Sequence, residues 1–299
     1  MSAVDRLLGR LARLDEVVDF NAVGRAHVPP VVIDNALRSV AVQGLSSFEQ
    51  FLRERGAEWA DHLTRARIPA SRLAGGTGPY SERIVHTLPR RFRDASVAMR
   101  PGLVNDLAET LTSFSSGSLV GHDLFFAWAG SNVQTSDVEA IVHLVGLPRG
   151  WGELTGVWKV VDPRFPGNVS TESLMRNFAD LRHTAAHSAD AVIDAVAIGS
   201  VTRNVKMVAM LLDITVSSAV DAVCRGAAVS DGIGRTLQVR QVKRDGSRWP
   251  EFGPGSSRAY RRHPDLRTAV DQAGARAHAN GEVLIVLDQT EIRDWRTPL

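Results

Sequence analysis

The stretch STESLMRNFADLRHTAAH, residues 170–187, has the pattern of a single amphipathic helix and decides the fold that we expect. Ser170 or Thr171 can cap the helix N-terminus, and Glu172 adds a negative charge to the first turn, where the helix dipole favours it. Apolar residues then recur at helical spacing and predict one buried face. These residues are Leu174, Met175, Phe178, Leu181 and Ala185.

Helical patterns also occupy the chain on both sides of this stretch. Apolar residues recur at helical spacing in residues 4–18, and a longer pattern covers residues 31–55 after Pro29 and Pro30. Further helices are expected at residues 80–95, 102–114, 135–145 and 200–224. Residues 148–168 are rich in glycine and proline around Trp151 and Trp158, so we predict a connector there.

The pattern changes near the C-terminal end of the chain. Residues 236–242 alternate as a half-buried strand does, and Asp245–Gly246 is a hairpin-turn signal. A helix is expected from Pro264 to about residue 279, followed by a buried strand at residues 283–287. The sequence therefore predicts a mainly α protein, with a helical-bundle domain at residues 1–225 and a small α+β domain of β-β-α-β order at residues 232–299.

Cysteine usage and hydropathy exclude several classes of protein. The chain of 299 residues has a single cysteine, Cys224, which excludes an intramolecular disulfide framework and a cysteine cluster for zinc. The first residues include Asp5 and Arg6, where a secretory signal would need an apolar run. Charged residues interrupt the longest apolar stretch, residues 205–223. We therefore expect a cytoplasmic protein that does not span a membrane.

Basic residues gather in the predicted C-terminal domain. Residues 235–267 contain 9 Lys and Arg against 3 Asp and Glu, although the formal net charge of the chain is only +2. A solvated surface is the ordinary explanation of such a cluster, and contact with a nucleic acid is the functional one. The residues that we expect to bind RNA are Arg240, Lys243, Arg244, Arg248, Arg261 and Arg262.

The end of the opening stretch combines residue types that can cleave RNA without a metal or another cofactor. Histidine, here His183 and His187, can accept the proton of the ribose 2′-hydroxyl or donate one to the leaving 5′-oxygen, because its ordinary pKa lies near neutrality. Arg182 stays charged and can bind the phosphate in the transition state. Arg182 and His187 differ by ~140° around an ideal helix. A compact site therefore requires a helix end, a bend or a second chain.

Other interpretations of this segment stay open. The arginine–histidine spacing also fits a second register, from Arg176 to His183. His183 and His187 lie four residues apart on one helix face and, with Asp180 and Asp190 nearby, can form a clip for a divalent metal. The segment can also be structural, in a non-catalytic adaptor that binds RNA or a protein partner.

With these residues considered together, the chain resembles the HEPN family, in the branch of RiboL-PSP-HEPN type, over about residues 30–224. The resemblance rests on the Arg182-x4-His187 motif and on its position after helical segments that include residues 36–52 and 131–147. One departure is Ser188, because a glycine often follows the histidine in this family. This departure affects the local helix end more than the chemistry.

The resemblance implies both an activity and its residues. Proteins of this type are helical ribonucleases of toxin or antiphage-defence systems, so it implies a metal-independent endoribonuclease that leaves 2′,3′-cyclic phosphate ends. Arg182 and His187 are then catalytic, and His183 occupies an auxiliary polar position. The implied partners are RNA, a second copy of the chain in a homodimer, and an antitoxin or a regulatory protein.

Overall fold

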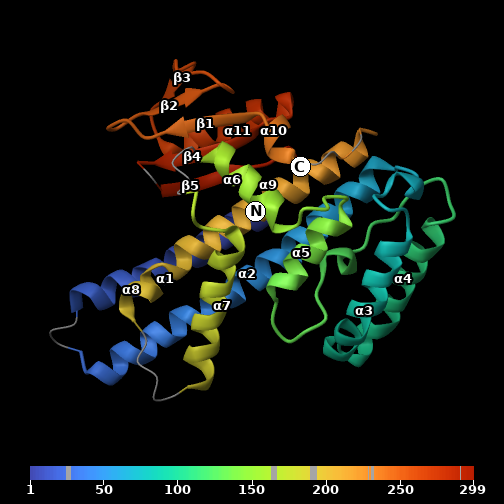
Figure 1. Ribbon diagram of the computed structural model, residues 1–299, viewed down its shortest axis with the longest axis horizontal. Coiled ribbons are helices and arrows are strands. Elements are labelled where there is room, and N and C mark those ends of the chain that lie inside the picture. The colour runs from blue at the N-terminus through green and yellow to red at the C-terminus, as the bar shows by residue number, and fades with distance from the viewer. Residues whose placement is uncertain (25–27, 163–166, 189–193, 228, 230–231, 290) are drawn as a thin grey trace. The chain divides into compact units, whose positions relative to one another are not determined.

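In the computed structural model, the chain is mainly helical, with a small mixed sheet near its C-terminal end (Figure 1). The predicted fold class, a helical protein with a small α+β part, is thereby confirmed. The structure describes residues 1–24, 28–162, 167–188, 194–227, 229, 232–289 and 291–299.

Internal contacts divide the chain into two compact units. Unit 1 contains Met1–Leu52 and Pro166–Met210, and unit 2 contains Arg53–Phe165 and Leu211–Leu299. The long helices α2 (Pro30–Ala66) and α9 (Val201–Cys224) therefore contribute residues to both units. This division differs from the predicted domain boundary at residues 226–231, and a separate C-terminal domain stays a prediction.

Unit 1 consists of helices that pack through apolar faces. It contains α1 (Ala3–Gly24), the first part of α2, α7 (Thr171–His187), α8 (Ala195–Gly199) and the first part of α9. The hydroxyl of Ser170 accepts a hydrogen bond from Ser173 N and so caps α7, as the sequence predicted. Phe178 of α7 meets Phe48 of α2 edge to face at 5.7 Å between ring centroids, and both side chains are fully buried. These contacts attach one face of α7 to α2.

Unit 2 contains the remaining helices. They are the second part of α2, α3 (Gly78–Asp94), α4 (Arg100–Ser113), α5 (Thr135–Leu144), α6 (Trp151–Val161), the second part of α9, α10 (Ile233–Thr236) and α11 (Leu266–Asn280), with 3-10 turns η1 (Ala70–Arg72), η2 (Val97–Met99) and η3 (Asp123–Phe126). Trp59 of α2 packs edge to face on Phe126 of η3 at 5.1 Å. Gly56 makes this approach possible, because a Cβ atom there would lie 2.9 Å from the Cβ atom of Phe126.

The predicted connector at residues 148–168 is wrong over much of its length, because α6 occupies Trp151–Val161. Glycines at positions 152 and 156 made the segment resemble a loop. The apolar residues have helical spacing, however, and Leu154, Val157 and Trp158 are all buried. Packing of this face offsets the low helix propensity of the glycines.

The sheet contains five strands rather than the three of the predicted β-β-α-β unit. The strands are β1 (Val239–Lys243), β2 (Trp249–Phe252), β3 (Arg261–His263), β4 (Val283–Asp288) and β5 (Glu291–Arg296), in the order β3-β2-β1-β4-β5. β1 is parallel to β4, and the other pairs are antiparallel. Asp245 and Arg248 close the predicted hairpin turn between β1 and β2. β3 and β5 were missed because they are short or rich in charged residues.

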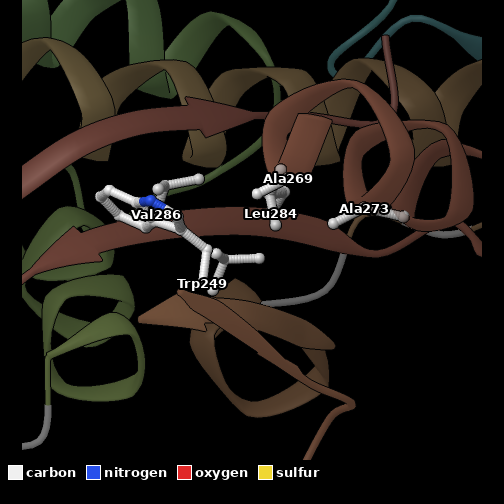
Figure 2. Packing of buried hydrophobic residues seen from close by; sticks show 7 residues of the cluster. Trp249, Ala269, Ala273, Leu284 and Val286 are labelled. Carbon is white, nitrogen blue, oxygen red and sulfur yellow. The ribbon is translucent and has the colours of Figure 1, made fainter. Parts of the chain in front are cut away.

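Helix α11 (Leu266–Asn280) covers one face of the sheet. Its alanines 269, 273 and 277 are buried against Val242, Trp249, Leu284 and Val286 (Figure 2). Small side chains allow the helix to approach the strands closely. The helix ends as predicted, with Gly281 in the left-handed conformation at φ 66°.

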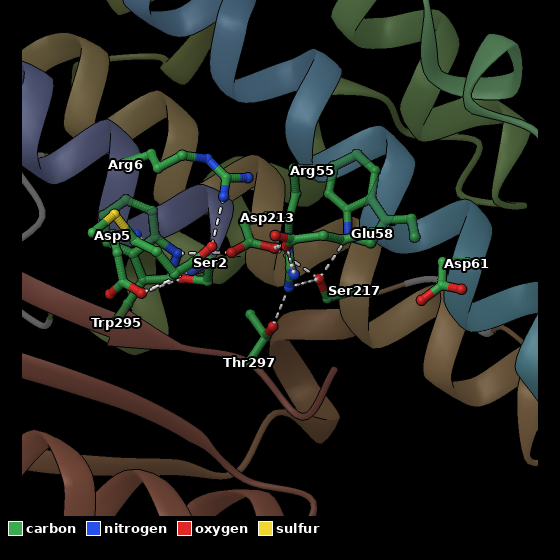
Figure 3. Close-up of polar contacts among 12 residues, drawn as sticks. Ser2, Asp5, Arg6, Arg55, Glu58, Asp61, Asp213, Ser217, Trp295 and Thr297 are labelled. Carbon is green, nitrogen blue, oxygen red and sulfur yellow. Dashed lines mark hydrogen bonds and ion pairs between the residues drawn. The ribbon is translucent and has the colours of Figure 1, made fainter.

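A buried polar network connects β5 and the residues after it to α2 and α9 within unit 2 (Figure 3). Arg55 donates to Asp213 Oδ1 at 2.7 Å, to Ser217 Oγ at 3.0 Å and to Thr297 Oγ1 at 2.6 Å. The indole of Trp295 donates to the other oxygen of Asp213 at 2.8 Å. Removal of residues 232–299 would therefore take one hydrogen-bond partner, Thr297 or Trp295, from each of two buried charges, Arg55 and Asp213.

One helical stretch, Ala195–Cys224, is long and apolar enough to cross a membrane by length and composition alone. Within its most apolar part, 72% of the residues are buried inside the protein. Burial of this kind is also found in the core helix of a globular protein.

Candidate active site

The candidate site lies at the C-terminal end of α7. Arg182 Nη1 is 3.5 Å from His187 Nε2, and the imidazole rings of His183 and His187 are 4.9 Å apart between centroids. Both histidines are exposed to solvent, and Arg182 is partly buried. The three residues that the sequence pattern selected therefore lie together at one end of one helix.

The helix end explains how Arg182 reaches His187. α7 ends at His187, and Ser188 has already left the helical conformation, with φ −121° and ψ 85°. Arg182 follows the buried Phe178 by four residues, so its aliphatic part begins near the buried face of the helix. From there its long side chain extends to the last helical residue. A compact site was expected to require a helix end, a bend or a second chain. The helix end brings Arg182 and His187 together within one chain.

Arg38 of α2 binds the backbone that ends α7. Its guanidinium donates from Nη1 to the carbonyl oxygen of Ser188 at 2.9 Å and to that of Ala185 at 3.5 Å. Nε of the same guanidinium pairs with Asp34 Oδ2 at 2.6 Å, one turn earlier on α2. A cation at this position satisfies carbonyl groups that the helix itself leaves without donors, and it interacts favourably with the helix dipole. Arg38 therefore holds the backbone on both sides of His187.

Sequence reasoning assigned no role to Arg38. The available signal was a polar pair, Asp34 and Arg38, four residues apart in an otherwise apolar helical stretch. Such a pair is common on helix surfaces, so it does not reveal that the arginine also binds a helix more than a hundred residues away in the chain.

The second register has weaker geometric support. Arg176 Nη2 pairs with Glu172 Oε1 at 2.5 Å, in the preceding turn of α7, and both side chains are accessible to solvent. This pair directs Arg176 away from His183, which lies in the opposite direction along the helix. Arg182, by contrast, contacts an imidazole directly.

In the described part of the chain, no group of metal-ligating side chains supports a metal clip at His183 and His187. No group of three or more His, Cys, Asp or Glu side chains is arranged to hold a metal ion there. Asp190, which the sequence placed next to this clip, lies outside the described residues.

The predicted RNA-binding residues differ in their exposure and in their ion pairs. Arg240 is only 7% exposed and pairs with Glu282 at 2.6 Å and Glu251 at 2.7 Å. Arg244 is exposed and pairs with Asp288 at 3.1 Å. The remaining predicted residues are exposed: Lys243, Arg248, Arg261 and Arg262.

A buried carboxylate organises the cations beside β1 and β2. Glu251 is fully buried and accepts hydrogen bonds from Arg240, from Arg276 of α11 and from His263 Nε2 at 2.8 Å. Burial alone would raise the pKa of Glu251, but the bonds from Arg276, His263 and Arg240 outweigh it and lower this pKa to about 2. The sequence offers no local signal for this cluster, because its members come from β1, β2, β3 and α11.

Comparison of the chain with protein-family models, characterised proteins and solved structures finds no match. The resemblance to the HEPN family therefore stays a prediction that rests on the motif and its position among the helices.

Proposed function

We propose that the protein is a metal-independent endoribonuclease whose active site is the C-terminal end of α7. The observation that carries this proposal is the contact between the Arg182 guanidinium and the His187 imidazole, with His183 beside them at the solvent-exposed helix end. A cation next to two imidazoles is suited to a reaction that moves protons around a phosphate.

The proposed reaction is an internal transfer at one phosphodiester. The ribose 2′-oxygen forms a bond to phosphorus while the bond from phosphorus to the 5′-oxygen breaks. One imidazole accepts the 2′-hydroxyl proton, and the other, protonated, donates a proton to the leaving 5′-oxygen. Arg182 binds the non-bridging oxygens, on which negative charge increases in the transition state. The products are a 2′,3′-cyclic phosphate and a 5′-hydroxyl.

Exposure of the site agrees with a polymeric substrate. Both histidines are open to solvent, so an RNA strand can pass over the end of α7 without entering a closed cavity. A homodimer would bring two such helix ends to one groove, and we include this assembly in the proposal. The wider role that we propose is that of a toxin or an antiphage-defence effector.

The test is cleavage by the purified protein of total RNA and of tRNA in the presence of EDTA, followed by analysis of the product ends. Cyclic phosphate and 5′-hydroxyl ends are expected. Arg182→Ala and His187→Ala should each reduce cleavage by ~10²–10⁴-fold, the usual contribution of acid–base groups, and His183→Ala by less.

Arg176→Ala is the matched control, because Arg176 is an exposed arginine on the same helix with its own carboxylate partner. It should cleave as the wild type does. Full activity of both Arg182→Ala and His187→Ala, with unchanged circular dichroism, would remove this helix end from the active site. RNA binding without any cleavage by the wild-type protein would instead support the non-catalytic adaptor.

A further inference from the structure

A hollow of about 650 Å³ lies between α11 and the loop that joins β2 to β3, within unit 2. Its volume is in the range of small-molecule and nucleotide sites. Arg240, Arg276 and Asn280 line it from β1 and α11, and Ser256, Arg258 and Tyr260 line it from the loop. As far as the chain is described, no Asp or Glu is among its lining residues.

Two of the arginines that line this hollow, Arg240 and Arg276, are held in place before any ligand arrives. Arg240 uses Nε and Nη1 to bind Glu282 and Glu251, and Arg276 uses Nε and Nη2 to bind Glu251. These bonds to carboxylates do not use Nη2 of Arg240 or Nη1 of Arg276. Because both side chains are already ordered, an anion that accepts from these nitrogens causes little further loss of side-chain entropy.

The loop supplies an exposed cation and an exposed aromatic ring. Ser256 Oγ accepts from Arg258 N at 3.2 Å and donates to Arg258 O at 3.0 Å, which gives the loop a defined shape before Arg258. Tyr260 is 65% exposed although its backbone N–H is anchored to Glu251 O at 2.7 Å. The Arg261 guanidinium lies over this ring at 6.0 Å from its centroid. An exposed ring on an anchored backbone is suited to stacking on a planar partner.

The charges around the hollow favour an anion. Arg240, Arg258 and Arg276 bring three positive charges. The two carboxylates that pair with Arg240 and Arg276, Glu251 and Glu282, bring two negative charges that are already engaged. An anionic group next to a flat aromatic surface is the combination that a nucleotide presents, with its phosphate and its base.

We propose that this hollow binds one nucleotide of single-stranded RNA, with the phosphate on Arg258 and the remaining guanidinium nitrogens of Arg240 and Arg276, and with the base stacked on Tyr260. The proposal deepens the proposed function and rests on it for the identity of the polymer. The hollow then holds a strand that the helix end of α7 cleaves. It differs from the predicted basic surface, because Tyr260 and Arg276 were not among the predicted contacts.

The experiment measures binding of the full-length protein to a fluorescent single-stranded 2′-O-methyl oligonucleotide across a salt series. The methylated 2′-oxygens prevent cleavage by 2′-hydroxyl attack, so binding is read without activity. Tyr260→Ala should weaken binding by ~5- to 150-fold, the effect of losing one stacked base, and Tyr260→Phe should restore it. Arg258→Gln should flatten the log–log salt dependence by about 0.7 for one lost phosphate contact.

Arg267→Gln is the matched control, because Arg267 is an exposed arginine of α11 outside the hollow. Its affinity should equal that of the wild type. Wild-type affinity of both Tyr260→Ala and Arg258→Gln would overturn the proposal. An equal loss of affinity in Arg267→Gln would also overturn it, because binding would then depend on the overall positive charge and not on the hollow. A loss in Arg258→Gln alone would reduce the hollow to a phosphate site and overturn the nucleotide assignment.

The two proposals can fail separately. If the protein binds the oligonucleotide through Tyr260 and Arg258 but never cleaves natural RNA, the hollow stands and the ribonuclease fails. If it cleaves natural RNA while the substitutions leave binding unchanged, the ribonuclease stands and the hollow fails.

Discussion

Arg38→Ala is expected to reduce RNA cleavage although Arg38 is not itself a proposed catalytic group. In the structure, its guanidinium holds the carbonyl oxygens of Ala185 and Ser188, which flank His187. Loss of this cation frees the last turn of α7 to unwind, and His187 then separates from Arg182 in part of the molecules. Arg38 is therefore a positioning residue.

The size of this effect follows from the bonds that are lost. The bond to Ser188 O at 2.9 Å joins a charged donor to a carbonyl, and such bonds contribute ~1.5–3 kcal/mol. The contact to Ala185 O at 3.5 Å is at the limit of a hydrogen bond and adds little. Because about 1.4 kcal/mol corresponds to a factor of ten, kcat should fall by ~10- to 150-fold.

The assay compares kcat and KM of Arg38→Ala, Arg38→Lys and the wild type on one RNA. The lysine variant keeps the positive charge and one donor, so we expect it to recover part of the lost kcat. KM should change little, because Arg38 positions the site and does not bind the strand. Hydrogen exchange should be faster only in the last turn of α7.

Two results would refute this reasoning. A wild-type kcat in Arg38→Ala would show that the end of α7 keeps its shape without the cation. A loss of kcat with global unfolding, and without recovery in Arg38→Lys, would show that Arg38 serves general stability only.

Three further predictions concern the metal, the site and the sheet. Chelation should leave the cleavage rate unchanged, and loss of activity in EDTA with recovery in Zn²⁺ would instead support the metal clip at His183 and His187. Mixing Arg182→Ala with His187→Ala protein should not restore activity, because the two groups meet within one chain, and a recovered rate would place them on different chains. Glu251 has a pKa of about 2 in the folded protein against an ordinary 4.5. As the pH falls, its carboxylate therefore takes up a proton in the unfolded chain before it does so in the folded protein. The stability that it contributes, about 3 kcal/mol, is present above pH 4.5 and is lost toward pH 2, and urea unfolding at several pH values should show this dependence weakened in Glu251→Gln.

Local sequence patterns were sufficient where one segment determines its own structure. The cap at Ser170, the apolar spacing of α7 and the turn at Gly281 were all predicted, because each depends on contacts within a few residues. The prediction failed at α6, where glycines at positions 152 and 156 looked like a loop and burial of Trp158 stabilises a helix instead. β5 was missed for the corresponding reason, since its charged residues hide a strand that is defined by pairing with β4.

The sequence by itself determined which residues carry the candidate chemistry. The three residues Arg182, His183 and His187 are close in the chain, so a helical pattern was enough to place them within two turns of the same helix. Only the tertiary structure decided that the helix ends at this point and that Arg38 holds the end in place. The same is true of Glu251, which collects cations from separate strands and a helix. The physical reason is that local propensity acts over a few residues, whereas charge pairing and burial act between segments that only folding brings together.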